Sequence, residues 1–277
     1  MGVRLVALDL DGTALDPSGS LRPAVERCVA RVRERGIRVV ITTGRRFRTG
    51  RPFAERLGLA GPCVFHHGAL VKEVASGETR ARHDLPDPTY RAAVAALGRL
   101  GPPIVFVDGF PDREDMVTTR HARAHPAHDR YLADNRTAHR LVDDLEAPTD
   151  GGALVVALMG EERRLGRLRA ELDTQLGDEA VVGIHPSYAG GHLLELLPAG
   201  VSKWSALRTL AAEAGIAPPE ILAIGDEMND VEMLRHAGLG VAMGNARPAV
   251  KDVADHVTAT NAEDGVAVAR ERFVLQT

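Results

Sequence analysis

Short apolar runs alternate with amphipathic segments at the start of the chain. Residues 3–10 are mostly apolar and lead into polar residues and a glycine, which predicts a buried strand. Residues 21–35 follow with apolar side chains at helical spacing, and Gly36 is typical of a helix end. Residues 37–42 form a second, β-branched run. A strand, a helix and a strand with short connections predict a parallel sheet covered by helices.

The same alternation returns toward the C-terminal end. It predicts a strand at 192–197, a helix at 203–214, a strand at 220–224, a helix at 230–237 and a strand at 240–242, all of which we assign to the same parallel sheet and its helices. The region before them has many prolines and shorter apolar segments, which is typical of a separate α+β unit. We therefore expect a core of residues 1–85 and 190–277, with residues 86–189 inserted into it.

Composition and charge exclude several classes of protein. The 277 residues are 44% hydrophobic and 26% charged, which is typical of a folded globular protein. The formal net charge of −4 gives no electrostatic reason to expect nucleic acid as a partner. No secretory signal is visible, and no apolar stretch approaches the roughly 20 residues that cross a bilayer. We expect a cytoplasmic protein without a membrane partner, and the sequence indicates no oligomeric state.

Cysteine and lysine are both rare in this chain. Cys28 and Cys63 lie in apolar surroundings without a CxxC or metal-binding spacing, which predicts buried thiols in a reducing compartment. Of the 34 basic residues, the lysines are Lys72, Lys203 and Lys251. Lysine is a compact point charge and arginine a planar fork, so a lysine in an arginine-rich chain suggests a specific need. We expect Lys72 and Lys251 to lie on the surface.

The strongest local motif is Asp-Leu-Asp-Gly-Thr at residues 9–13, directly after the first predicted strand. Asp9 and Asp11 project to the same side of an extended backbone, at the strand end where parallel sheets bind ligands. Two like charges this close imply a divalent cation. A calcium loop would need a glycine at its sixth position, where Ala14 stands, so we discount that alternative.

Three further polar groups lie at the ends of other predicted core elements. They are Thr43-Gly44-Arg45 after the second strand, Lys203 at the start of a helix, and the run 225–230 (GDEMND) after a third strand. Taken separately, these fit a strand-to-helix turn, a surface lysine and a helix cap. Their joint occurrence favours a functional site instead.

A histidine group in the inserted region is a weaker candidate for metal binding. His121, His125 and His128 have a spacing that suggests zinc, but Pro126 interrupts any helix that would align them. No cysteine accompanies them, so we interpret the segment as solvated and polar.

Together the motifs DxDGT, TGR, lysine and GDxxND resemble those of the haloacid dehalogenase (HAD) superfamily of phosphohydrolases, and within it the Cof-type subfamily IIB. The resemblance covers the whole predicted core and implies an α/β protein with a Rossmann-like parallel sheet and an inserted α+β cap of the C2 type B. Two residues depart from the family pattern: His67 replaces an asparagine, and Trp204 replaces a glycine. We expect Trp204 to pack against the core or the cap.

The resemblance implies roles for the carboxylates. Asp9 would be the nucleophile that forms an aspartyl-phosphate, and Asp11 the general acid and base. Mg²⁺ would be the cofactor, held by the Asp9 side chain, the Asp11 backbone carbonyl and Asp226. Asp230 would support the metal site or orient Lys203.

The resemblance also implies contacts to the phosphate. Thr43 would donate a hydrogen bond to a phosphoryl oxygen, and Lys203 would neutralise charge on the nucleophile and the phosphoryl group. Gly44, Arg45 and Asn229 would contact the phosphate or the leaving group.

The function that follows is Mg²⁺-dependent hydrolysis of a small phosphate monoester, such as a sugar phosphate or a similar phosphorylated metabolite. The cap would close over the site and contact the leaving group. A phosphomutase of the same superfamily is an alternative, and it would move phosphate between positions of one sugar. A phosphometabolite-binding protein without catalysis is another, although binding alone does not require Asp11.

Overall fold

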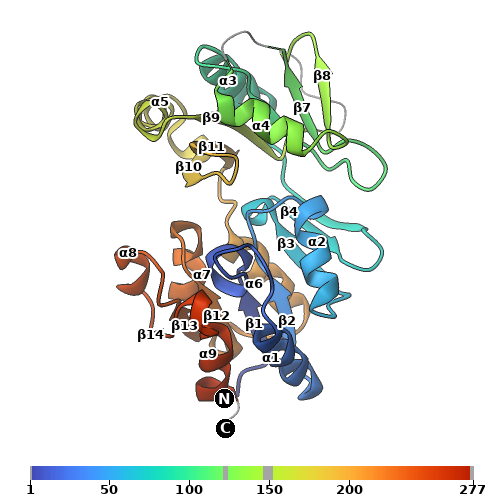
Figure 1. The fold of residues 1–277 in the computed structure, drawn as a ribbon, viewed down its shortest axis with the longest axis vertical. Helices are drawn as coiled ribbons and strands as arrows, with labels where there is room; N and C mark the ends of the chain where they lie inside the picture. The colour runs from blue at the N-terminus through green and yellow to red at the C-terminus, as the bar shows by residue number, and fades with distance from the viewer. Residues whose placement is uncertain (1, 121–123, 146–151, 275–277) are drawn as a thin grey trace. The chain divides into compact units, whose positions relative to one another are not determined.

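The computed structural model describes residues 2–120, 124–145 and 152–274. Contacts within the chain divide it into two compact units. The first unit consists of Met1–Ala81 and Ser202–Thr277, and the second unit of Arg82–Val201. Figure 1 shows the elements of both, and each unit is described by itself. None of the helices in the described ranges is long and apolar enough to cross a membrane.

The first unit is built on a parallel sheet with the strand order β14-β13-β12-β1-β2. These strands are β14 (His256–Val257), β13 (Leu239–Ala242), β12 (Ile221–Gly225), β1 (Leu5–Leu8) and β2 (Arg38–Ile41). β1 pairs with β12 on one side and β2 on the other, and all of its residues are buried. A strand buried on both faces reads as a continuous apolar run, so the sequence predicted it.

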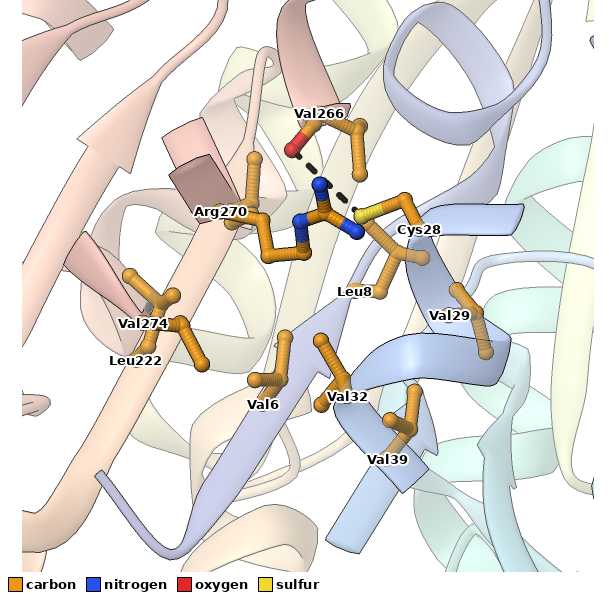
Figure 2. A pocket seen from close by; sticks show the side chains of 11 residues that line it. Val6, Leu8, Cys28, Val29, Val32, Val39, Leu222, Val266, Arg270 and Val274 are labelled. Atoms are coloured by element: carbon orange, nitrogen blue, oxygen red, sulfur yellow. Dashed lines mark hydrogen bonds between the residues drawn. The ribbon is translucent and has the colours of Figure 1, made fainter. Parts of the chain in front are cut away.

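Helices cover this sheet. The first unit contains α1 (Pro23–Glu34), α2 (Phe47–Arg56), α6 (Lys203–Glu213), α7 (Val231–His236), α8 (Pro248–Lys251) and α9 (Gly265–Phe273). α1 and α9 enclose a small cavity against Val6 and Leu8 of the sheet, which Figure 2 shows. A smaller sheet follows α2, with the order β3 (Pro62–Phe65), β4 (Leu70–Glu73) and β5 (Thr79–Arg82).

The second unit is an α+β sandwich, as expected for the inserted region. Its sheet has the order β10 (Ala180–Pro186), β11 (His192–Pro198), β9 (Val155–Gly160), β6 (Ile104–Phe106), β7 (Met116–Thr119) and β8 (His139–Val142). Its helices are α3 (Asp87–Gly98), α4 (Pro126–Asp134) and α5 (Glu162–Leu176). One apolar cluster joins α3 and α5 to one face of the sheet, through residues such as Leu97, Leu165 and Leu194.

The assignment of residues 192–197 to the parallel core sheet is wrong. This segment is β11, which pairs antiparallel with β10 and β9 of the second unit. Gly190 and Gly191 have φ of +97° and +62° and turn the chain back from β10 into a hairpin. An apolar strand fits either sheet, so the pattern alone did not reveal its partner. The units meet in sequence at 81/82 and 201/202 rather than at the expected 85/86 and 189/190.

The expected surface position of Lys72 is also wrong. Its exposed fraction is 4%, and its ammonium lies 5.1 Å from the centre of the Phe47 ring. A cation over an aromatic face gains electrostatic attraction that offsets part of its desolvation. Trp204 packs as expected, with an exposed fraction of 8% and its ring stacked on His236.

The histidines of the inserted region differ in their surroundings. His125 caps α4, because its Nδ1 accepts a hydrogen bond of 3.2 Å from the backbone of Ala127. His128 has an exposed fraction of 4%, so a solvated position is wrong for it. Pro126 begins the helix rather than interrupting it. His121 lies outside the described residues.

Both cysteines are free and buried, as expected. Burial raises the pKa of Cys28 to about 11 and that of Cys63 to about 12. Cys28 lines the cavity of Figure 2 together with Arg270, whose side chain is 5% exposed. Arg270 Nη2 pairs with the exposed Glu271 at 3.1 Å, whereas its buried Nε finds no hydrogen-bond partner among the described residues.

Candidate active site

The site begins where β1 ends. Asp9 is the first residue after the strand, and its backbone N–H still donates to Ile224 of β12. The chain then turns at Gly12, whose φ is +77°. A Cβ on Gly12 would lie 2.1 Å from Asp226 Oδ2, so only glycine fits there. Thr13 donates from Oγ1 to Asp226 Oδ1 at 2.8 Å. The Gly-Thr pair of the motif therefore positions Asp226.

Lys203 connects the carboxylates from different strands. It is the first residue of α6, whose N-terminus is capped by Ser202. Its side chain is 2% exposed, and Nζ lies 2.6 Å from Asp9 Oδ1 and 2.7 Å from Asp230 Oδ1. The start of a capped helix holds the lysine stem in place, so the ammonium is fixed between two buried carboxylates.

Asp230 organises the loop that follows β12. Its Oδ2 accepts hydrogen bonds from the backbone N–H groups of Asp226 and Glu227, at 2.9 and 3.0 Å. Its Oδ1 accepts from Lys203, so donors occupy both oxygens. A Cβ on Gly225 would lie 2.5 Å from Asp230 Cγ, which explains the glycine at the strand end. Asp230 therefore orients Lys203 and the Asp226 backbone.

Burial and charge raise the pKa values of the carboxylates. Burial raises the pKa of Asp9 well above its ordinary value, against the opposing charge of Lys203. Burial, reinforced by Asp230, raises the pKa of Asp226 to about 7. For Lys203, burial alone would lower the pKa, but Asp230 and Asp9 together outweigh it and hold the pKa above its ordinary value. The lysine is therefore charged at neutral pH.

These carboxylates suit a divalent cation. Asp9, Asp226 and Asp230 each bring a ligand oxygen within 4.8 Å of the others. When all are ionised, their charge exceeds that of the single Lys203 ammonium by two units. Oxygen donors of this kind are those that Mg²⁺ prefers. The donor set and its charge thus fit the expected metal, with Asp9 and Asp226 better disposed as ligands than the saturated Asp230.

Arg45 binds Asp11. Its Nε and Nη2 donate to the two Asp11 carboxylate oxygens at 2.7 and 2.6 Å, and the guanidinium lies 4.8 Å from the centre of the Phe53 ring. Thr43 is fully buried, and its Oγ1 accepts from the Arg45 backbone N–H at 3.1 Å. The TGR turn after β2 thus meets the DxDGT turn after β1, as expected from neighbouring parallel strands.

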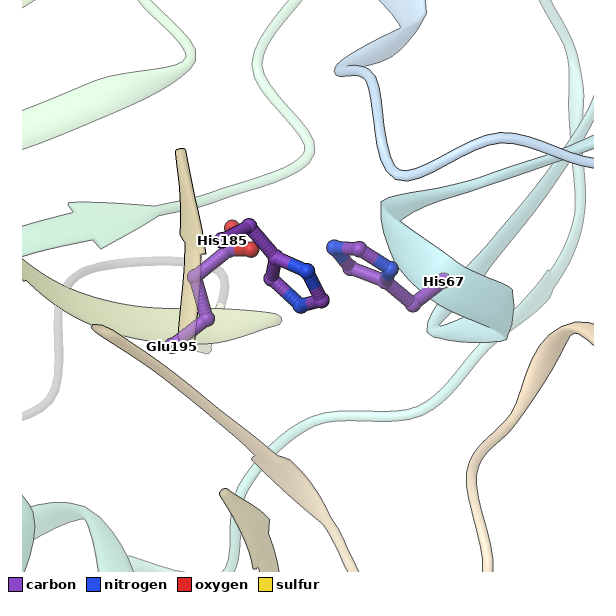
Figure 3. Close-up of side chains that lie close together, drawn as sticks. All are labelled: His67, His185 and Glu195. Atoms are coloured by element: carbon purple, nitrogen blue, oxygen red, sulfur yellow. The ribbon is translucent and has the colours of Figure 1, made fainter. Parts of the chain in front are cut away.

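His67 takes part in the site despite its departure from the family pattern. It lies on the turn after β3, which Figure 3 shows, with φ of +56° and an exposed fraction of 8%. Its Nδ1 lies 3.0 Å from Asn229 Nδ2, within hydrogen-bond distance. A Cβ on Gly44 would lie 2.3 Å from His67 Cε1, so this glycine makes room for the imidazole. His67 is thus a structured site residue rather than a polar residue at a strand end.

Asn245 is a site residue that the sequence reasoning missed. Its Nδ2 donates to the Gly12 carbonyl at 2.8 Å and lies 3.4 Å from Asp226 Oδ2. It follows β13, the strand next to β12 in the sheet. The sequence did offer a sign of this role, because Asn245 is a polar residue shortly after a predicted strand of the parallel sheet. We used that criterion for the strands before Asp9, Thr43 and Asp226 but not for β13.

The sheet and the site together define an α/β protein that gathers carboxylates and a buried lysine at the carboxyl ends of parallel strands. The model of the haloacid dehalogenase-like hydrolases matches residues 6–269. The 5-amino-6-(5-phospho-D-ribitylamino)uracil phosphatase of Bacillus subtilis is 30% identical over 274 residues, which are 95% of this chain and 94% of the relative. An HMP-PP phosphatase of Escherichia coli is 30% identical over 259 residues, covering 92% and 89% of the two chains.

Solved structures agree with these relatives. A haloacid dehalogenase-like hydrolase from Bacteroides thetaiotaomicron has a TM-score of 0.80 at 29% identity and covers 98% of this chain and 99% of its own. The chain belongs to the haloacid dehalogenase-like hydrolase family, as a Cof-type member. Its enzyme class is that of the phosphoric monoester hydrolases.

Proposed function

We propose that this enzyme hydrolyses a small phosphate monoester through an aspartyl-phosphate intermediate, with Mg²⁺ as cofactor. The observation that carries the proposal is the buried Lys203 ammonium, fixed at 2.6 Å from Asp9 and 2.7 Å from Asp230. It occupies one oxygen of Asp9 and leaves the other to attack phosphorus. A buried cation there also offsets the negative charge that gathers at the phosphoryl group.

In the first step, the free Asp9 oxygen bonds to phosphorus while the bond from phosphorus to the ester oxygen breaks. Asp11 gives its proton to the departing oxygen, and the alcohol leaves. In the second step, Asp11 accepts a proton from water, whose oxygen attacks phosphorus. The Asp9–phosphate bond then breaks, releasing inorganic phosphate and restoring the Asp9 carboxylate.

Substrate binding would release Asp11 from Arg45. The guanidinium holds both Asp11 oxygens, at 2.7 and 2.6 Å. A phosphoryl group accepts the same two parallel hydrogen bonds and competes for Arg45. Asp11 is then free to carry a proton to the leaving oxygen. Gly44, Arg45 and Asn229 stay our proposed substrate contacts, and Thr43 a proposed donor to the phosphoryl group.

Asp9, Asp226 and the backbone carbonyl of Asp11 would hold Mg²⁺, with Asp230 supporting them through its hydrogen bonds to Lys203 and the Asp226 backbone. The bound ion would supply charge neutralisation for the phosphoryl oxygens. Asn245 and Thr13 fix the Asp226 carboxylate and so set the geometry of that ligand.

We propose that the second unit is the cap that selects the substrate, since most of the core residues proposed above would contact the phosphate group that all such substrates share. The relatives named above act on a phosphorylated ribitylaminouracil and on HMP-PP. These names support a small phosphorylated metabolite as the substrate class of this enzyme.

Phosphate release from a panel of phosphorylated metabolites, with Mg²⁺ or with EDTA, tests the proposal. We expect release with Mg²⁺ and its loss with EDTA. Asp9→Asn should abolish turnover while circular dichroism stays unchanged, because it removes the nucleophile and keeps the shape of the side chain. Activity of Asp9→Asn near that of the wild type would exclude Asp9 as nucleophile. Transfer of phosphate within one sugar, without release, would indicate a mutase.

A further inference from the structure

The turn between β3 and β4 has an uncommon backbone conformation. His66, His67 and Gly68 have φ of +46°, +56° and +112°, so three residues in succession lie in the left-handed region. L side chains rarely adopt such angles, because their Cβ then crowds a neighbouring carbonyl oxygen. A strained backbone of this kind persists only where the surrounding structure enforces it, and it is found most often at functional sites. The turn 66–68 therefore indicates a role beyond the connection of two strands.

Backbone hydrogen bonds join this turn to the loop after β2. The N–H of His66 donates to the Arg45 carbonyl at 3.0 Å, and the N–H of His67 donates to the Thr43 carbonyl at 3.1 Å. Successive N–H groups of an extended strand point to opposite sides, whereas a turned backbone can direct both to one loop. The turn thus fixes two carbonyls of the loop 43–45, from which we propose that Thr43 and Arg45 contact the phosphoryl group.

Gly68 contacts the start of α6, the helix that carries Lys203. A Cβ on Gly68 would lie 2.2 Å from the carbonyl oxygen of Ser202 and 3.4 Å from the backbone nitrogen of Lys203. The Ser202 carbonyl accepts from the Ala206 N–H at 3.3 Å, so it belongs to the first turn of the helix. Any side chain at position 68 would therefore displace Ser202 and, with it, the lysine that follows in the chain.

The position of Lys203 tolerates little displacement. Its Nζ lies 2.6 Å from Asp9 and 2.7 Å from Asp230, and a hydrogen bond weakens when its atoms separate beyond about 3.2 Å. We propose that the turn 66–68 is a positioning element for phosphoryl transfer, which holds the Lys203 end of α6 and the loop 43–45 in register. This inference rests on the proposed phosphatase function and adds positioning residues to it. All of these residues belong to the first unit.

The same role accounts for the residue type at position 67. Asparagine and histidine are both enriched among residues with positive φ, so the histidine that replaces the family's asparagine keeps the backbone conformation of the turn. β-branched residues are the least tolerated at such angles, and glycine is the most tolerated. Position 67 therefore requires a residue that accepts positive φ, whatever its side chain contacts.

Gly68→Ala tests the contact between the turn and α6. We expect kcat for p-nitrophenyl phosphate with Mg²⁺ to fall about 10–100-fold, as it does when a reacting group is misplaced. The Mg²⁺ dissociation constant from titration calorimetry should rise less than about threefold, because Thr13 and Asn245 fix Asp226 from other loops. Gly36→Ala is the matched control. Gly36 has φ of +75° and nothing within 4 Å of an added Cβ, so kcat should stay within about twofold.

A pair of variants at position 67 keeps the inference testable if Gly68→Ala does not fold. His67→Gly and His67→Val both remove the imidazole, and neither new residue has polar side-chain atoms. A difference between them therefore reports the backbone conformation and not a contact of the ring. We expect kcat of His67→Val to be at least about tenfold below that of His67→Gly.

Three results would overturn this inference alone. They are equal kcat values for the two variants at position 67, a folded Gly68→Ala enzyme with kcat within about twofold of the wild type, and a loss of Mg²⁺ affinity in Gly68→Ala as large as its loss of kcat. A wild-type enzyme that releases no phosphate from any ester with Mg²⁺ would instead overturn the proposed function on which the inference rests.

Discussion

Lys203→Arg preserves charge and tests whether the site needs a point charge. The side chain is 2% exposed, and Nζ is held at 2.6 Å from Asp9 and 2.7 Å from Asp230. A guanidinium is longer and planar, so it cannot occupy the place of the ammonium without displacing one of the carboxylates. A hydrogen bond between charged groups contributes about 1.5–3 kcal/mol. Loss of one to two such bonds from the transition state corresponds to a decrease of about 10–10⁴-fold in kcat/KM.

The assay measures kcat/KM with p-nitrophenyl phosphate and Mg²⁺, next to the free energy of unfolding in urea. Lys251→Arg is the matched control, because Lys251 donates only to the Gly244 carbonyl among the hydrogen bonds described for it, outside the carboxylate cluster. Lys251 is half-buried, and arginine keeps both its charge and a donor for that carbonyl, so the variant should retain activity within about threefold. Activity of folded Lys203→Arg within about twofold of the wild type would refute the reasoning.

Other predictions follow from the same contacts. Gly12→Ala should weaken Mg²⁺ binding at least about tenfold by titration calorimetry, because its Cβ would meet Asp226 Oδ2 at 2.1 Å; unchanged affinity would contradict this. Arg270→Met should leave the free energy of unfolding in urea unchanged or raise it by about 1–2 kcal/mol, because the buried Arg270 Nε–H has no hydrogen-bond partner among the described residues. A decrease of about 3 kcal/mol in that free energy would count against this prediction. The pKa of Asp226 is raised to about 7, so without Mg²⁺ the contribution of this carboxyl to stability is present below about pH 4 and is lost as the pH rises through 7. The melting temperature should therefore fall between about pH 4 and pH 7 with EDTA, and should fall less with Mg²⁺. Identical melting curves under the two conditions would refute the assignment.

Much of the site was accessible from the sequence because its polar residues directly follow short apolar runs. Asp9 and Asp226 each follow a short buried run, and parallel neighbours bring such ends to one edge of a sheet. The contacts from Lys203 to Asp9 and Asp230 were expected from the family resemblance alone. They depend on how α6 packs, which the spacing of apolar residues leaves open.

The failures have a common physical origin. The run around Glu195 is apolar enough for either sheet, and only the turn at Gly190-Gly191 selects β10 as its partner. Lys72 is polar in sequence but buried in the fold, because the aromatic ring that accepts its charge lies 25 positions earlier, at Phe47. A local sequence pattern indicates the average exposure of a residue type. It does not identify the tertiary partner that allows one polar residue to be buried or one apolar strand to join another sheet.

The order of segments along the chain has a consequence for synthesis on the ribosome. Asp9 and Lys203 are 194 positions apart, and β1 lacks one of its two neighbours until β12 emerges. The second unit is one continuous segment with its own apolar cluster, so it can fold while the first unit is still incomplete. Long loops add little closure entropy, about 0.6 kcal/mol per doubling of length. The insertion therefore affects mainly timing. The candidate active site is among the last parts of the nascent protein to form, and the buried face of β1 needs protection until then.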